Sequence, residues 1–481
     1  MRQNSFHKII FKNTGLFGIA QLIKILMRLF SNKIAALFLG PVGIGIIGLL
    51  ENVIGVIQGF TNFGIADSSV REIAIADQQL DGLKSKRLIK IVYKWAIATG
   101  VLGLTVAIVF SRQIHQTVFG NNIAYIWVVL LATHFLFTSL SSIRIAVLQA
   151  KKSINLIVKY NICSTIISSL ITVVGYYLYG INAIIPVMII SSFGAFLLSL
   201  YFTKHIKTVP YHMTLKLVYD EGLPIAKLGL LLSVCAIFGQ LCFYIIKWYL
   251  KEYYSYEILG VYQVSNTILV GYLGLVFAAM SNDYYPRLCN YENDIENFNN
   301  LVNDQTELAL LLVVPAVLIL YLIAPFLVTL LYSAEFLSVL NILKIGLVAI
   351  IFKAIVWPIG FIPLVKGNKL LFFKQNVLGD GVNLVASVFF FYYFNLVGLG
   401  LAMVLMFVVS GFYNYYVVRK YYNFKFRRAT LKTMGFAMLL AIVAVTIALT
   451  NEFENFNIYI LMITLTSVIN SLFRLKNKLQ F

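Results

Sequence analysis

The chain has 481 residues, of which 60% are hydrophobic and only 12% are charged. A soluble protein of this length carries about twice that charged fraction, so the composition excludes a water-soluble globular protein. The net charge of +19 would suit nucleic acid, but the cations gather in alternate connections between apolar segments. That alternation is the positive-inside bias of membrane proteins, so no nucleic-acid partner is expected.

Apolar segments long enough to cross a bilayer core of about 30 Å recur along almost the whole chain. They predict an all-α polytopic membrane protein with about fourteen transmembrane helices. The expected helices lie near 14–39, 43–66, 88–110, 121–148, 157–178, 181–203, 222–247, 256–285, 306–332, 336–364, 370–394, 397–418, 432–450 and 455–473. Because the terminal segments share the cation-rich side, both termini are predicted to be cytoplasmic.

A longer basic connection, "KHIKTVPYHMTLKLVYDEG" (204–222), separates the sixth and seventh predicted helices. It predicts two pseudo-symmetric six-helix lobes and two further helices. The predicted boundaries are 1–205 for the N-terminal lobe, 206–221 for the linker, 222–421 for the C-terminal lobe, and 422–481 for the extra pair with its basic tail. A faint repeat, "GLFGIAQL" against "EGLPIAKL", agrees with this division, which is common among transporters.

The first predicted helix contains "QLIKILMRLFSNK" (21–33), where a lipid-facing helix should carry no charge. Viewed down the helix axis, Lys24, Arg28 and Gln21 lie within one sector of about 100° of the helix circumference. An ionised side chain at the bilayer centre costs about 2.5–3.5 kcal/mol on insertion scales. A polar face of this kind therefore predicts a water-filled interior.

Other predicted helices also contain charges. The further cations are Arg144, Lys227 and Lys353, and the main carboxylates are Glu51 and Asp380. The excess of cations predicts a substrate-binding cavity for anions, especially phosphates. The two carboxylates are candidates for coupling to H⁺ or Na⁺, if burial raises their pKa.

Two structural alternatives remain open for these charges. Lys24 with Glu51, and Lys353 with Asp380, would also make plausible ion pairs between helices. Arg144 and Lys227 lie nearer the cytoplasmic ends of their helices, where long side chains reach the interface.

The sequence contains no catalytic or metal-binding motif. Its four cysteines have no CxxC spacing or histidine pair, so no metal and no cofactor is expected. "GIGIIG" (43–48) matches a dinucleotide fingerprint formally, but an apolar segment follows it, and Gly55 and Gly59 continue the series. Close helix packing is therefore the better interpretation.

Tyrosines cluster at the ends of several predicted helices, as in "YYSY" (253–256), "YY" (392–393) and "YNYY" (413–416). Most are expected to belong to interfacial aromatic belts. Stacking of a minority on sugar rings stays open.

The segment "NKIAALFLGPVGIGIIGLLENVIGVIQGFTNFGIADSSVREIA" (32–74) resembles Wzx-type O-antigen flippases. These form the polysaccharide-transport branch of the multidrug/oligosaccharidyl-lipid/polysaccharide (MOP) exporter superfamily, and the resemblance is strong over roughly the first 150 residues. It implies a MATE-like fold of two six-helix lobes around a central cavity, in the bacterial inner membrane. It also implies translocation of undecaprenyl-pyrophosphate-linked oligosaccharide for lipopolysaccharide biosynthesis, with an O-antigen polymerase and a chain-length regulator as partners. Lys24, Arg28 and Lys353 fit the cavity cations of this branch.

The two extra helices depart from the twelve expected of many Wzx proteins. Lipid II flippases of the same superfamily have fourteen helices, and their extra pair forms a lipid groove. Two other functions were weighed. A MATE-like drug or cation antiporter is disfavoured by the excess of cations. A membrane O-antigen polymerase is disfavoured because the outer connections are short and nearly devoid of Arg, so the chain is expected to be a transporter and not an enzyme.

Overall fold

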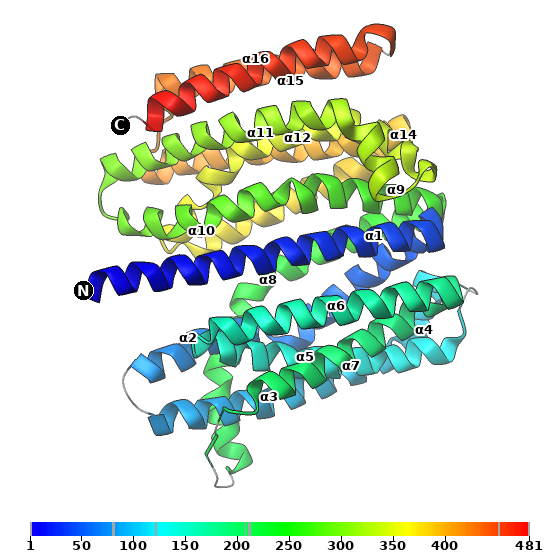
Figure 1. Cartoon of the computed structure of the whole chain (residues 1–481), viewed down its shortest axis with the longest axis vertical. Helices are drawn as coiled ribbons and strands as arrows, with labels where there is room; N and C mark the ends of the chain where they lie inside the picture. Colours follow the sequence, from blue (N-terminus) through cyan, green and yellow to red (C-terminus); the bar gives the residue numbers. More distant parts are fainter. Residues whose placement is uncertain are drawn as a thin grey trace. The chain divides into compact units, whose positions relative to one another are not determined.

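The computed structural model describes residues 2–78, 82–120, 123–206, 208–209, 213–450 and 453–479, with the side chains of the first helix described from Ile23 onward. Within these ranges the regular structure is entirely helical (Figure 1), which confirms the all-α prediction. The chain forms two compact units, unit 1 (Met1–Tyr244) and unit 2 (Ile245–Phe481). The six-helix lobes and the linker at 206–221 stay predictions.

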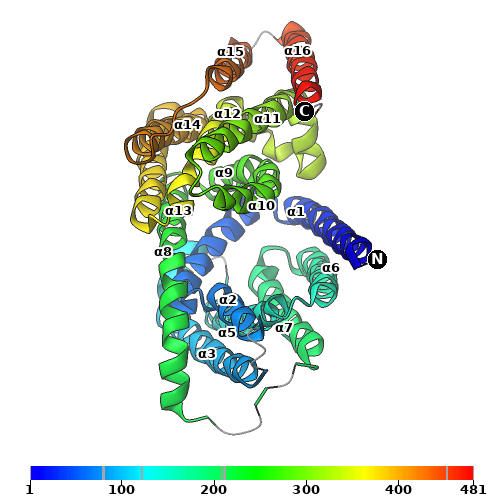
Figure 2. The same cartoon turned by 90° about the vertical axis from the view of Figure 1, so that its left-hand side faces the viewer.

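Unit 1 contains eight α-helices, a short π-helix and a 3₁₀ turn within its described ranges. They are α1 (Arg2–Asn62), α2 (Ile65–Gln78), α3 (Gly82–Val109), α4 (Ser111–Ile114), η1 (His115–Phe119), α5 (Tyr125–Ala150), α6 (Ile154–Tyr179), η2 (Gly180–Ala183), α7 (Ile184–Thr203) and α8 (Leu215–Tyr253). Figure 2 shows α8 as one continuous helix, and its last residues, from Ile245, belong to unit 2.

Unit 2 contains the remaining elements. They are α9 (Tyr256–Asn266), η3 (Thr267–Tyr272), α10 (Gly274–Asn290), α11 (Ile295–Leu331), η4 (Ala334–Val339), α12 (Leu340–Gly360), α13 (Ile362–Val365), α14 (Lys369–Tyr422), α15 (Arg428–Thr450) and α16 (Phe453–Leu479). The segment η3 is a π-helix between α9 and α10.

Eleven helical stretches among the described residues are long and apolar enough to cross a bilayer. Three of these stretches contain a sharp break, so each supplies two membrane crossings. The breaks lie in α1 at Gly40, in the α6–α7 stretch at η2, and in α14 at Asn395. A straight helix of 61 residues would be about 90 Å long, three times the hydrocarbon core. The φ angles of Gly40 and Asn395, 61° and 48°, lie in the left-handed region that Gly and Asn adopt most readily. The result is fourteen crossings, as predicted.

In three places the structure is helical where hydropathy did not indicate a helix. Helix α2 is a separate amphipathic helix that the sequence interpretation did not expect. Helix α8 starts at Leu215, before its apolar part, and α11 starts at Ile295. Residues 290–305 lie between two predicted helices, 256–285 and 306–332. Because most of them belong to α11, their interpretation as a connection was wrong for most of its length. Asp294 caps α11 by accepting a hydrogen bond from the Asn297 amide, 3.1 Å away, so a polar sequence begins a helix there.

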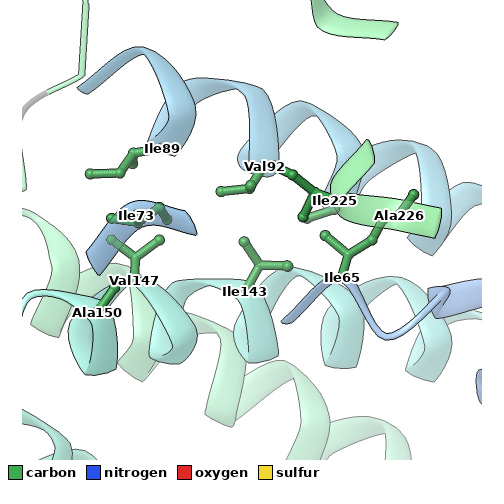
Figure 3. Close-up of a cluster of buried hydrophobic side chains, with 10 residues drawn as sticks. Ile65, Ile73, Ile89, Val92, Ile143, Val147, Ala150, Ile225 and Ala226 are labelled. Carbon is green, nitrogen blue, oxygen red and sulfur yellow. The ribbon is translucent and has the colours of Figure 1, made fainter. Parts of the chain in front are cut away.

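A buried apolar cluster holds one end of unit 1 together (Figure 3). It joins four helices, and its members are Ile65, Ile73, Ile89, Val92, Ala96, Ile143, Val147, Ala150, Ile225 and Ala226. These side chains pack closely on one another, and the dispersion contacts of a dense apolar cluster are individually small but collectively large. Because Ile225 and Ala226 belong to α8, this cluster fixes the start of α8 to α2, α3 and α5.

An ionic contact lies beside this cluster. The Lys151 ammonium on α5 is 2.6 Å from the Asp77 carboxylate on α2 and 2.9 Å from the Ser85 hydroxyl on α3. Burial alone would raise the pKa of Asp77, but the hydrogen bonds with Lys151 and Ser85 outweigh it and hold this pKa below its usual value. The charged pair therefore favours the folded state at neutral pH and ties three helices at one point.

The connection into α8 packs on α3. Three α3 side chains donate to main-chain oxygens of this connection and of the first turn of α8: Lys90 to Val209, Lys94 to Met213 and Trp95 to Val218. Arg87 of α3 also pairs with the Glu221 carboxylate. The predicted linker is thus bound to unit 1 along its described length.

Glycines let α1 and α8 approach closely within unit 1. A Cβ atom added to Gly229 would lie 2.2 Å from the Phe63 main-chain oxygen, and one added to Gly59 would lie 2.6 Å from Ile237. The nearby Asn52 amide donates to the Gln240 side-chain oxygen at 2.6 Å. The predicted role of Gly59 in helix packing is therefore confirmed.

Replacing Gly229 by Ala should destabilise the protein by about 1–3 kcal/mol, because the backbone of Phe63 cannot move away. Gly435→Ala is the matched control, since no atom lies within 4 Å of its added Cβ. It should leave stability unchanged or raise it by up to about 1 kcal/mol. Melting temperatures in one detergent measure both effects, and equal values for the two variants would contradict the proposed close approach.

Polar groups bond α11 to the start of α15 and to the connection before it, and the Arg474 guanidinium of α16 donates to the Thr433 hydroxyl of α15. Thr430 donates to the buried Glu307 carboxylate at 2.6 Å, and Asn303 bonds both the Lys425 oxygen and the Arg427 amide. These contacts lie where α11 begins to be apolar. The pair α15–α16 is therefore an integral part of unit 2.

Candidate functional site

Lys24 and Arg28 lie on the first half of α1, and both side chains are exposed. Neighbouring Ser31 is 3.0 Å from Ser169 of α6, which fixes the rotation of this half-helix within unit 1. The two cations therefore have a defined face on which they remain accessible. The side chain of Gln21, predicted on the same face, lies outside the described residues.

The other predicted charges of unit 1 differ in their surroundings. Arg144 of α5 is half-buried, with its guanidinium 4.8 Å from the centre of the Tyr93 ring and 3.1 Å from the Thr203 hydroxyl. Lys227 is exposed on α8. Glu51 is exposed and interacts electrostatically with Tyr176. Arg144 thus has packing partners inside the unit, and its place in a cavity stays a prediction.

Lys353 and Asp380 belong to unit 2. The Lys353 ammonium lies 4.9 Å from the centre of the Phe277 ring, a cation–π contact between α12 and α10. Among the residues that the structure describes, neither side chain forms an ion pair. The structural alternative of a Lys353–Asp380 pair is therefore not realised in this conformation.

Asp380 instead lines a cavity of about 330 Å³ inside unit 2. The cavity lies between α12 and the two halves of α14. Its lining is Val356, Trp357, Gly360, Phe361, Phe372, Gln375, Asn376, Gly379, Asp380, Met406, Phe407, Ser410 and Asn414. Gly379 keeps it open, because a Cβ atom there would lie 3.1 Å from the Ser410 hydroxyl.

Among the described residues, two side-chain amides of this cavity have at least one atom without a hydrogen-bond partner. Gln375 is 6% exposed, and neither its side-chain oxygen nor its nitrogen is bonded; Asn414 is 5% exposed, and its oxygen is not bonded. A buried amide without a partner costs about 1–3 kcal/mol in proteins. Since these groups lie beside a carboxylate, the cavity has the chemistry to hold a small cation, a proton or water.

Sequence reasoning found Asp380 but missed Gln375 and Asn414. Gln375 lies five positions before Asp380 on the same predicted helix, and Asn414 is hidden in "YNYY", which was interpreted through its tyrosines. Nothing in the sequence distinguishes an unpartnered amide from a bonded one. Within the described residues there is no cluster of three or more His, Cys, Asp or Glu side chains that could bind a metal ion.

The fold is similar to solved transporter structures. "Lipid II flippase MurJ, inward closed conformation" has a TM-score of 0.73 and 17% identity, covering 97% of this chain and 100% of that one. An inward-facing multidrug resistance MATE family transporter of the MOP superfamily has a TM-score of 0.67 and 12% identity, covering 85% and 98%. A mutant MATE transporter, VcmN, from Vibrio cholerae has a TM-score of 0.60 and 14% identity over the same shares.

This architecture is a polytopic helical fold of the MOP type. The family model described as "Polysaccharide biosynthesis protein" matches residues 34–341, and the chain belongs to that family. The resemblance noted in the sequence is thereby confirmed for the polysaccharide biosynthesis family and for the MOP-type fold. No curated protein matches the sequence.

Replacing Gln375 by Met should raise the melting temperature by about 1–3 °C, because it removes an unpartnered amide and keeps the side-chain volume. The matched control is Asn303→Leu in the same unit, since Asn303 is 1% exposed and fully bonded. The Asn303→Leu substitution should lower the free energy of unfolding by about 2–4 kcal/mol, because it removes these hydrogen bonds. Thermal unfolding in one detergent tests both, and a destabilised Gln375→Met would show that the amide is already satisfied.

Proposed function

We propose that this protein is a flippase for undecaprenyl-pyrophosphate-linked oligosaccharides, including O-antigen repeat units. It would move them from the cytoplasmic to the periplasmic leaflet of the bacterial inner membrane by alternating access, with both of its termini in the cytoplasm. Membership of the polysaccharide biosynthesis family carries this proposal, because a MOP-type membrane protein that serves polysaccharide biosynthesis would be expected to carry polysaccharide precursors. An O-antigen polymerase and a chain-length regulator are its proposed partners.

The cations within the crossings support a pyrophosphate-bearing cargo. Lys24 and Arg28 are accessible on α1, and Lys353 lies in α12 without a carboxylate partner among the described residues. Lysine and arginine bind phosphate through charge-assisted hydrogen bonds. We assign these three side chains to the translocation path and keep Lys227, Gln21 and Arg144 as further candidates.

Asp380 is the better of the two candidates for ion coupling. Its cavity also contains the unpartnered amide of Gln375, whereas Glu51 interacts with Tyr176. A carboxylate among amides with free oxygen atoms suits a proton or Na⁺, whose binding would change the charge of this cavity.

A second candidate function is multidrug or cation antiport. The similarity of the fold to a multidrug MATE transporter favours it. The predominance of cations within the crossings opposes it, because a cationic drug would be repelled. Drug sensitivity of a deletion strain would separate the two functions.

Substituting Lys24 and Arg28 by Ala should lower surface polysaccharide at least tenfold in a flippase-deficient strain that depends on this protein. Loss of one charge-assisted hydrogen bond costs about 1.5–3 kcal/mol, which corresponds to tenfold or more. Lys24→Arg should retain transport, and Lys33→Ala, on the opposite side of the helix, is the positional control. Normal export by the double variant at normal protein level would refute the role of these cations.

Replacing Asp380 by Asn should abolish the acceleration of transport by an imposed H⁺ or Na⁺ gradient in proteoliposomes, because an amide neither titrates nor supplies a negative charge. The control is Asp283→Asn, which removes an exposed carboxylate paired with Arg287 at 2.9 Å. That variant should keep the wild-type response. If Asp380→Asn responds to the gradient as the wild type does, Asp380 is not the coupling group. Glu51 is then the next candidate to test.

A further inference from the structure

Two tyrosine motifs that are far apart in the sequence meet at one end of unit 2. One is the end of α8, around Tyr253, and the other lies just before the break of α14 at Asn395. The ring of Tyr254 is 4.6 Å from that of Phe391, edge to face. Tyr249 shares a hydrogen bond with Tyr254 and interacts electrostatically with Tyr392. The sequence interpretation treated these motifs as separate parts of an interfacial belt.

The exposed rings of this cluster are held in place by their neighbours. Tyr253 is 66% exposed and Tyr392 is 67% exposed, yet each contacts another ring, Tyr249 at 5.2 Å and Tyr393 at 5.1 Å. Trp248 lies 6.3 Å from Tyr253. We call Trp248, Tyr249, Tyr253, Tyr254, Tyr392 and Tyr393 the tyrosine platform. It presents ring faces and hydroxyl groups together on a preorganised surface.

The charges of unit 2 indicate which side of the membrane the platform faces. Cations gather where α14 begins and ends: Lys366, Lys369, Lys374, Arg419, Lys420, Arg427 and Arg428. The break at Asn395 puts the platform at the opposite end of the same helices. There, Lys251 is neutralised by Glu252 at 3.0 Å. By the positive-inside rule the platform is extracytoplasmic.

A belt residue and a platform residue differ in what surrounds them. Belt rings lie around the circumference at headgroup level. Tyr177 and Tyr179, at the end of α6 in unit 1, are 68% and 69% exposed, and Tyr177 contacts the Phe38 ring of α1 at 5.5 Å. Among the described residues neither ring contacts another tyrosine, so these two serve as the belt comparison. The platform instead gathers hydroxyl-bearing rings of α8 and α14 at one place, where Tyr254 contacts Phe391 and Tyr249 interacts electrostatically with Tyr392. Such a grouping matches a ligand that has both C–H faces and many hydroxyls.

We propose that the tyrosine platform is a carbohydrate-binding surface that receives the sugar part of the translocated lipid-linked oligosaccharide on the outer side. The identity of that sugar rests on the proposed function. Axial C–H groups of a pyranose carry partial positive charge and are attracted to the negative face of an aromatic ring. Tyrosine hydroxyls supply hydrogen bonds, and a side chain with two torsions loses little entropy on binding.

The probe is the soluble repeat-unit oligosaccharide released by mild acid from the polyprenyl-pyrophosphate-linked precursor of the host, because its sugar–phosphate bond is acid-labile. The full chain in nanodiscs is titrated with it, and tryptophan emission is recorded, with Trp248→Phe identifying the platform signal. Tyr253→Ala with Tyr392→Ala should weaken binding at least tenfold. Tyr177→Ala with Tyr179→Ala should leave it unchanged, because belt residues serve only the interface.

Variants that keep the aromatic rings show whether a loss of binding by the Ala variants is due to misfolding. Tyr253→Phe with Tyr392→Phe should fold as the wild type does and lose about threefold in affinity, since stacking remains and hydroxyls are lost. Absence of saturable binding by the wild type would overturn the proposal. So would equal losses in the platform and belt variants.

The platform and the flippase function can fail separately. If the wild type binds the oligosaccharide through Trp248 but does not restore polysaccharide export to a flippase-deficient strain, the proposed function fails and the platform stands. If export is restored while the Ala variants bind the oligosaccharide as tightly as the wild type, the platform fails and the function stands.

Discussion

Helices inside a bilayer gain no hydrophobic free energy by packing on one another, because the surrounding lipid is as apolar as their side chains. This protein meets that constraint with close backbone approach and with hydrogen bonds between polar side chains. Gly64, just after the end of α1, packs against Gly229 of α8, and further along the same two helices Asn52 is bonded to Gln240. Hydroxyl pairs such as Thr99–Ser139, 2.9 Å apart, do the same between α3 and α5. The arrangement of unit 1 depends on these contacts.

The same constraint separates structural from functional polar groups. A polar side chain within a crossing is costly unless it is bonded, so a bonded one is explained by packing. Thr138 with Gln58, and Thr99 with Ser139, fall in that class. Gln375 remains without a partner inside a cavity, beside an unpaired Asp380. Such groups need an explanation outside packing, and ion binding supplies one.

Much of the fold could be predicted from the sequence, since apolar length and charge alternation are local properties. The fourteen crossings and the break at Gly40 followed from them. Hydropathy failed where polar residues extend a helix, as at Ile295, and where an amphipathic helix lies between crossings, as in α2. Charged candidates such as Asp380 were visible in an apolar run. The unpartnered state of Gln375, and the meeting of Tyr254 with Phe391, depend on tertiary packing and could not be predicted.

The bonds between α11 and the C-terminal pair also bear on how this fold varies during evolution. The chain from Lys425 to Thr430 bonds both Asn303 and Glu307, which are buried. Without Thr430 of α15, the Glu307 carboxylate at the edge of the hydrocarbon core would lose a hydrogen-bond partner, at a cost of about 1–3 kcal/mol. We therefore expect relatives that stop after twelve crossings to favour an apolar residue at position 307. An alignment that compares relatives with twelve and with fourteen crossings would show whether the two features vary together.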